Sequence, residues 1–115
     1  MKILMVLCNV PDKEIALRIA QALIKGKLAA CVNILSPCQS LYHWEGTIQS
    51  SQEIPLLIKT TNACYQALEA CIIGLHPYSM PEIVAIPITQ ASSGYLNWVR
   101  QSCVMPVVGS VAKSC

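Results

Sequence analysis

The sequence predicts an α+β fold in which an antiparallel sheet carries two helices on one face. Two observations predict it. Apolar runs of strand length alternate with two segments in which apolar residues recur at helical spacing. The order along the chain is strand, helix, strand, strand, helix, strand, with a short helical segment at the end. The 115 residues suffice for one such domain and are too few for two.

The first half of the pattern begins with residues 2–8, KILMVLC, a continuous apolar run typical of a central strand buried on both faces. Pro11 or Asp12 then suits the first positions of a helix over residues 14–27. Gly26 stands where a left-handed residue would end that helix.

The middle of the chain predicts two further strands. Residues 28–35, LAACVNIL, form the second strand, and residues 36–61 form a bent strand, a turn near Glu45 and Gly46, and a returning strand. Pro55 lacks an N–H group, so it is expected at a sheet edge or a bulge.

The last segments complete the pattern. Residues 62–75 predict a helix that Asn62 can cap, residues 81–90 a fourth strand interrupted by Pro87, and residues 92–102 a short third helix. This order is the ferredoxin-like plan. We therefore predict a ferredoxin-like domain over residues 1–102.

The C-terminal tail, residues 103–115, has no clear period. We expect it to be disordered or to pair with a neighbouring subunit.

The amino-acid composition indicates which binding partners to expect. Hydrophobic residues make up 54% of the chain and charged residues only 12%, against a usual charged share of about 25%. We therefore expect some apolar surface to meet another subunit. There is no run of Lys or Arg and no Phe, so a nucleic-acid partner is not expected. No apolar run reaches the roughly 20 residues that span a bilayer, so no membrane association is expected.

The number and spacing of the cysteines indicate the cellular compartment of the protein. Their number is odd and no Cys-x-x-Cys pair occurs, so neither a disulfide framework nor a closed zinc site is indicated. A reducing cytoplasm suits so many unpaired thiols. The apolar start of the chain is too short for a signal peptide. The seven are Cys8, Cys31, Cys38, Cys64, Cys71, Cys103 and Cys115.

The predicted topology brings Cys8 near His76. The first and fourth strands should be antiparallel neighbours, so the end of the first meets the loop HPYSMPE before the fourth. A thiolate and an imidazole could bind copper or zinc there, and Glu82 could add an oxygen ligand. The same pair could be a nucleophile and its base. The same residues also fit purely structural roles, with His76 ending a helix and Cys8 packing in the core.

Four other side chains are candidates for binding or assembly. Tyr42 and Trp44 alternate onto one strand face and are expected as interface or core aromatics. Lys59 is a solvated charge or an anion ligand. Trp98 is expected to cover the core or a neighbouring subunit.

Five motifs, in this order and at these separations, resemble the CutA divalent-cation tolerance family. The resemblance covers about residues 2–101. The motifs are KLAACVNI, SLYHWEG, LLIKTT, HPYSMPEIVAIPI and YLNWV.

This resemblance implies a ferredoxin-like protomer in a tight homotrimer, similar in architecture to PII signalling proteins. It also implies a cytoplasmic role in tolerance of copper and other divalent cations, with no catalytic reaction and no obligatory cofactor. The family's proposed copper ligands are a Cys that Cys8 matches and a His pair before Pro-Tyr. His76 matches the second His, and Leu75 replaces the first.

Three functions follow for testing. The first is a non-enzymatic trimer that binds a divalent metal ion through Cys8 and His76. The second is a PII-like sensor that binds a small anion between subunits, although no Gly-rich phosphate loop is present. The third, an acylphosphatase-like hydrolase, would need an Arg after the first strand, where the sequence reads CNVPDKE. The candidate ligand-binding residues for the PII-like sensor are Lys59, Tyr78, Glu82 and Trp98.

Overall fold

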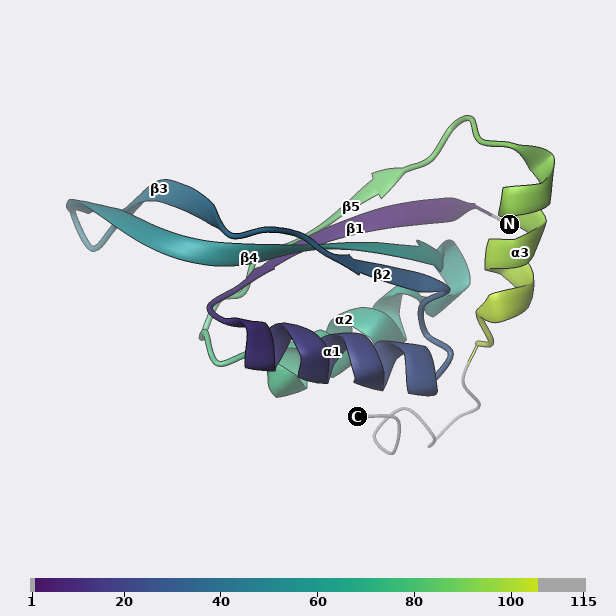
Figure 1. Ribbon diagram of the computed structural model, residues 1–115, viewed down its shortest axis with the longest axis horizontal. Helices are drawn as coiled ribbons and strands as arrows, with labels where there is room; N and C mark the ends of the chain where they lie inside the picture. The colour runs from purple at the N-terminus through teal and green to yellow at the C-terminus, as the bar shows by residue number, and fades with distance from the viewer. Residues whose placement is uncertain (1, 106–115) are drawn as a thin grey trace.

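The computed structural model describes residues 2–105 and confirms the predicted α+β order (Figure 1). Strands β1 and β4 are central in a sheet of order β2-β4-β1-β5, β3 pairs with the far end of β4, and all pairings are antiparallel. The elements are β1 (Ile3–Val10), α1 (Lys13–Lys25), β2 (Cys31–Ile34), β3 (Cys38–Trp44), β4 (Thr47–Thr61), the 3-10 turn η1 (Asn62–Cys64), α2 (Tyr65–Leu75), β5 (Ile83–Pro87) and α3 (Ser93–Ser102).

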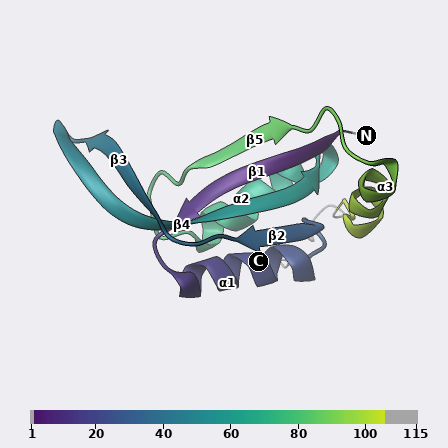
Figure 2. The ribbon, with the colours of Figure 1, turned by 45° about the horizontal axis from the view of Figure 1, so that its top comes forward.

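The core lies between the sheet and the two long helices. Helices α1 and α2 cover the same face of the sheet, and α3 lies at one end of it (Figures 1 and 2). Alternate residues of β1 point into this core, so Val6, Cys8 and Val10 are fully buried against residues such as Ile19 of α1 and Ile72 of α2. Each fully buried aliphatic side chain contributes about 1.5–3 kcal/mol. In the part of the chain that the structure describes, no helix covers the opposite face, which we call the open face (Figure 1).

Helix α1 begins close to the predicted position, at Lys13, and ends at Lys25, two residues before the predicted end. The Asp12 carboxylate caps it by accepting a hydrogen bond from the Ile15 N–H at 2.9 Å. Gly26 is still right-handed, with φ of −78°, and Lys27 takes the left-handed conformation, with φ of 57°. The prediction that Gly26 is the left-handed residue is therefore wrong.

The entry to α2 also differs from the prediction. The chain first makes the η1 turn, and the Thr61 hydroxyl accepts a hydrogen bond from the Cys64 N–H at 3.3 Å. Thr61 therefore supplies the side-chain cap that was assigned to Asn62, because the helical conformation starts one residue earlier.

The β3–β4 hairpin turns where the sequence predicts. Trp44 and Thr47 are paired, and the two residues between them, Glu45 and Gly46, have φ of 51° and 82°. Two left-handed residues form the two-residue turn that matches the twist of paired strands. The hairpin extends well beyond the rest of the sheet and curves away from it (Figure 1).

Pro55 is not at an edge, because β4 is a central strand paired with β1 through Asn9. Its carbonyl accepts from the Leu35 N–H at 3.0 Å. The Pro55 nitrogen faces the same side, where residues 35–37 interrupt the pairing between β2 and β3. The residue without an N–H group therefore lies where the pairing between strands is interrupted. This agrees with the predicted position at a bulge rather than at a sheet edge.

The start of the tail is attached to the domain. The Cys103 N–H donates to the Val99 carbonyl, and the Val104 N–H donates to the Lys27 carbonyl at 2.9 Å. The rest of the predicted tail, residues 106–115, lies outside the described residues. In residues 2–105, no helix has the length and apolar character needed to cross a membrane.

Candidate functional site

The predicted meeting of β1 with the loop before β5 is present. Cys8 pairs with Ile83, and the loop holds His76 against the end of β1. The His76 Nδ1 accepts a hydrogen bond from the Tyr78 N–H at 3.2 Å. The other ring nitrogen, Nε2, therefore carries the proton and donates to the Asn9 carbonyl at 2.8 Å. His76 is only 7% exposed, and both of its nitrogens are occupied.

Cys8 has no exposed surface and belongs to the core between sheet and helices. Burial raises the pKa of its thiol to about 12, and the nearby carboxylates of Glu82 and Glu53 add to the increase. The thiol is therefore protonated at neutral pH, whereas the thiolate is the form that binds metal ions and attacks electrophiles.

The side chains of Cys8, His76 and Glu82 are not grouped as three metal ligands in residues 2–105. Alternation along β1 places Cys8 on the helix side of the sheet, whereas Glu82 bonds to Asn9, the next residue, which faces the other way. Across residues 2–105, no three His, Cys, Asp or Glu side chains are placed to hold a metal ion together. The topology brought these residues near one another, but the strand directs them to opposite faces.

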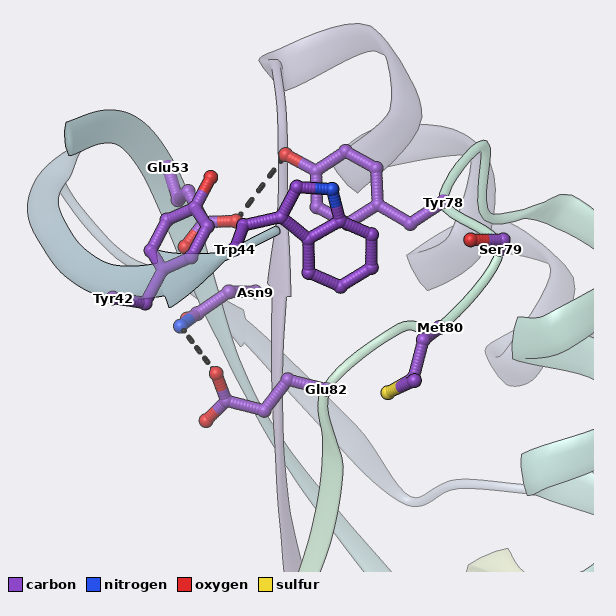
Figure 3. Close-up of a pocket in the computed structure, with 8 residues that line it drawn as sticks. All are labelled: Asn9, Tyr42, Trp44, Glu53, Tyr78, Ser79, Met80 and Glu82. Carbon is purple, nitrogen blue, oxygen red and sulfur yellow. Dashed lines mark hydrogen bonds between the residues drawn. The ribbon is translucent and has the colours of Figure 1, made fainter. Parts of the chain in front are cut away.

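A pocket of about 360 Å³ lies on the open face, where the β3–β4 hairpin meets the end of β1 and the loop before β5 (Figure 3). Its lining combines aromatic rings with carboxylates. The lining residues are Asn9, Tyr42, Trp44, Glu53, Tyr78, Ser79, Met80 and Glu82.

The hairpin register places Tyr42 and Trp44 in this pocket. In the β3–β4 ladder these two residues project to the same face as Ser51 and Glu53. The Tyr42 hydroxyl lies 2.7 Å from the Ser51 hydroxyl, which fixes the ring. The aromatics predicted for a subunit interface thus line the pocket in the single chain.

Two hydrogen bonds hold the carboxylates. The Asn9 amide Nδ2 donates to Glu82 Oε1 at 3.2 Å, and the Tyr78 hydroxyl donates to Glu53 Oε2 at 3.3 Å (Figure 3). Burial and the Glu53 charge raise the pKa of Tyr78, so its hydroxyl stays a donor. Glu53 is only 7% exposed, and the Asn9 Oδ1 is buried without a hydrogen-bond partner. The charged groups that line the pocket are both carboxylates, so the pocket favours a cation.

Only two of the four residues predicted to bind an anion lie together in the structure. Tyr78 and Glu82 line the pocket, whereas Lys59 donates to the Asn33 side chain in the β2–β4 ladder. Trp98 lies on α3 against Tyr95, with ring centroids 5.6 Å apart, and is 45% exposed. Neither Lys59 nor Trp98 lines the pocket.

Sequence reasoning missed Asn9 and Glu53. The alternation of Ile54, Leu56 and Ile58 already indicates that Glu53 faces away from the core. Its burial comes from Tyr78, which lies 25 residues away in sequence, and no local pattern reports that contact.

The chain is similar to known proteins over most of its length. The family described as "CutA1 divalent ion tolerance protein" matches residues 4–102. A "Divalent-cation tolerance protein CutA" of Thermus thermophilus is 45% identical over 97 residues, which are 84% of this chain and 94% of that protein. The protein of the same name from Citrobacter koseri is 39% identical over 97 residues, 84% of each chain.

Solved structures agree with the sequence relatives. The divalent cation tolerance protein of Thermus thermophilus superposes with a TM-score of 0.87 at 43% identity, covering 89% of this chain and 99% of that one. CutA1 from Oryza sativa gives 0.89 at 38% identity, covering 92% and 97%. A structure from Archaeoglobus fulgidus, named a periplasmic divalent cation tolerance protein, gives 0.84 at 34% identity, covering 87% and 97%. With this family match, sequence identity and structural similarity over most of its length, the chain belongs to the CutA1 divalent ion tolerance protein family.

Proposed function

We propose that the protein is a non-enzymatic binder of divalent cations and that the cation binds in the pocket, through the carboxylates of Glu53 and Glu82. The observation that supports this most is the charge of the lining, because two carboxylates meet there without a lysine, arginine or histidine among the lining residues. The names of its relatives refer to tolerance of divalent cations, which agrees with such a role.

The donor atoms indicate which ions bind. Besides the two carboxylates, the lining offers the hydroxyls of Tyr42, Tyr78 and Ser79, all of them oxygen ligands. Oxygen donors suit Mn²⁺, Mg²⁺ and Ca²⁺, whereas copper prefers nitrogen and sulfur. Copper at Cys8 and His76 would require ionisation of a buried thiol and the loss of a His76 hydrogen bond. The proposal therefore assigns the ion to the carboxylates.

The proposal includes a homotrimer. Large apolar side chains remain exposed on the hairpin, where Leu41 is 70% and Ile48 is 72% exposed, and on the open face, where Val84 and Ile86 are almost half exposed. Surfaces of this kind are usually covered by another subunit. We also place the protein in the cytoplasm, because most of the cysteines in residues 2–105 are free thiols, namely Cys8, Cys31, Cys38, Cys64 and Cys103.

Calorimetric titration of MnCl₂ and CaCl₂ into chelator-stripped protein tests the proposal. We expect Glu82→Gln and Glu53→Gln each to weaken binding by about tenfold or more, equivalent to about 1.4 kcal/mol. Glu14→Gln, an exposed charge on α1, is the matched control and should bind like the parent. Absence of binding by the parent, or equal binding by all variants, would contradict the proposal. Light scattering on the same samples tests the trimer.

A further inference from the structure

The pocket has more room and more aromatic surface than a single metal ion uses. Its volume of about 360 Å³ falls within the range of small-molecule sites, about 300–1,000 Å³. Three aromatic side chains, Tyr42, Trp44 and Tyr78, line it together with Met80. These rings can ligate a metal ion only through the two tyrosine hydroxyls, so the cation proposal leaves most of the lining unexplained.

Aromatic faces and carboxylates together recognise one class of ligand. A ring face attracts an organic cation within about 6 Å of its centroid, and Trp is the strongest of the rings. In the pocket, the indole of Trp44 and the ring of Tyr78 lie across from Glu82 and Met80 (Figure 3). A flat or alkylated cation between them would meet a ring on one side and a carboxylate and a thioether on the other.

The hydrogen bonds within the pocket leave acceptor capacity for such a ligand. Asn9 and Tyr78 each donate to one oxygen of a carboxylate, so the second oxygens of Glu82 and Glu53 remain as acceptors. A guanidinium or ammonium group supplies several N–H donors at once, and a guanidinium can bind a carboxylate through two of them.

We propose that the pocket binds an alkylated guanidinium or ammonium group, with Glu53 and Glu82 balancing its charge and Trp44 providing the ring face. This inference rests on the proposed function in one respect, because the same carboxylates hold the divalent ion. The organic cation and the divalent ion therefore compete for one pocket, and the ring faces act on the organic cation alone.

Calorimetry with ethylguanidinium chloride and n-butylammonium chloride tests the inference, with the neutral analogue ethylurea as the comparison. We expect both cations to bind and ethylurea not to bind. Trp44→Leu should weaken binding of both cations about threefold or more, and should weaken Mn²⁺ binding less than it weakens either organic cation. Trp98→Leu on α3 is the matched control and should bind like the parent. Circular dichroism checks folding, and Tyr42→Leu replaces Trp44→Leu if that variant does not fold.

The outcomes separate the two proposals. If ethylguanidinium binds no better than ethylurea, or if Trp44→Leu and Trp98→Leu weaken it equally, the organic-cation inference is wrong even when Mn²⁺ binds. If the organic cations bind and Mn²⁺ does not, the inference stands and the proposed function falls. Acetyl-arginine methylamide distinguishes the source of the group: tighter binding than ethylguanidinium assigns an arginine side chain of a protein partner, and weaker binding assigns a free small molecule.

Discussion

His76 joins the end of β1 to the loop before β5, because its Nε2 donates to the Asn9 carbonyl at 2.8 Å while its Nδ1 accepts from the Tyr78 N–H. Both partners line the pocket. The Tyr78 ring also lies against the imidazole, with centroids 4.7 Å apart. His76 is therefore a positioning residue, which fixes the backbone from which Asn9 and Tyr78 reach the two carboxylates.

Replacing His76 tests this structural role. His76→Ala removes both hydrogen bonds and leaves the Asn9 carbonyl and the Tyr78 N–H without these partners, so we expect it to lower the free energy of unfolding by about 2–3 kcal/mol. The measurement is urea unfolding in the presence of EDTA. A metal-ligand role predicts instead that the variant matches the parent when metal is absent, and this result would overturn the positioning role.

The Cys8 thiol should make stability depend on pH in the alkaline range. Its pKa rises from 9.0 to about 12 in the folded chain. Between these values the folded state binds more protons than the unfolded state, so the stabilisation is complete below pH 9 and is lost as pH rises toward 12. The slope approaches about 1.4 kcal/mol per pH unit.

Urea unfolding from pH 8 to pH 11 measures this effect. Cys8→Val keeps an apolar residue on the strand and removes the titrating group, so its stability should fall less steeply than that of the parent. The difference between the two slopes isolates Cys8 from the other thiols and tyrosines. Identical slopes would show that the thiol is more accessible to water than its burial indicates.

The hairpin turn offers a test of backbone conformation alone. Gly46 has φ of 82°, and a Cβ added there would meet nothing within 4 Å. Gly46→Ala should therefore cost about 1 kcal/mol through its left-handed conformation, without a steric clash. Glu45→Asn should stabilise the hairpin, because Asn-Gly is the preferred pair for this turn. Thermal unfolding of both variants gives the signs, and destabilisation by Glu45→Asn would contradict the assigned turn.

Much of the fold could be predicted because each element carries its own signal. The apolar run over 2–8, the helical spacing in 14–27 and the Glu45–Gly46 turn depend on residues adjacent in sequence. Topology then correctly placed Cys8 beside the loop that holds His76. The small errors occurred at helix ends, where Lys27 and Thr61 took roles assigned to neighbouring residues, because propensity does not fix a boundary to one residue.

The site could not be predicted to the same degree. Being neighbours in a sheet does not place two residues on one face, and Cys8 and Glu82 project to opposite faces. The pocket depends on the curvature of the hairpin, which places Tyr42 and Trp44 in the same pocket as Tyr78. The contacts of Asn9 with Glu82 and of Glu53 with Tyr78 join segments far apart in sequence, so Asn9 and Glu53 carried no local signal of their role.

The central claim is that a divalent ion binds at Glu53 and Glu82 rather than at Cys8 and His76. Anomalous scattering from crystals of the reduced protein soaked in MnCl₂ tests it most directly, because the signal locates the ion itself. We expect an anomalous peak in the pocket, between the two carboxylates, that is lost in Glu82→Gln. A peak beside Cys8 and His76, with none in the pocket, would contradict it.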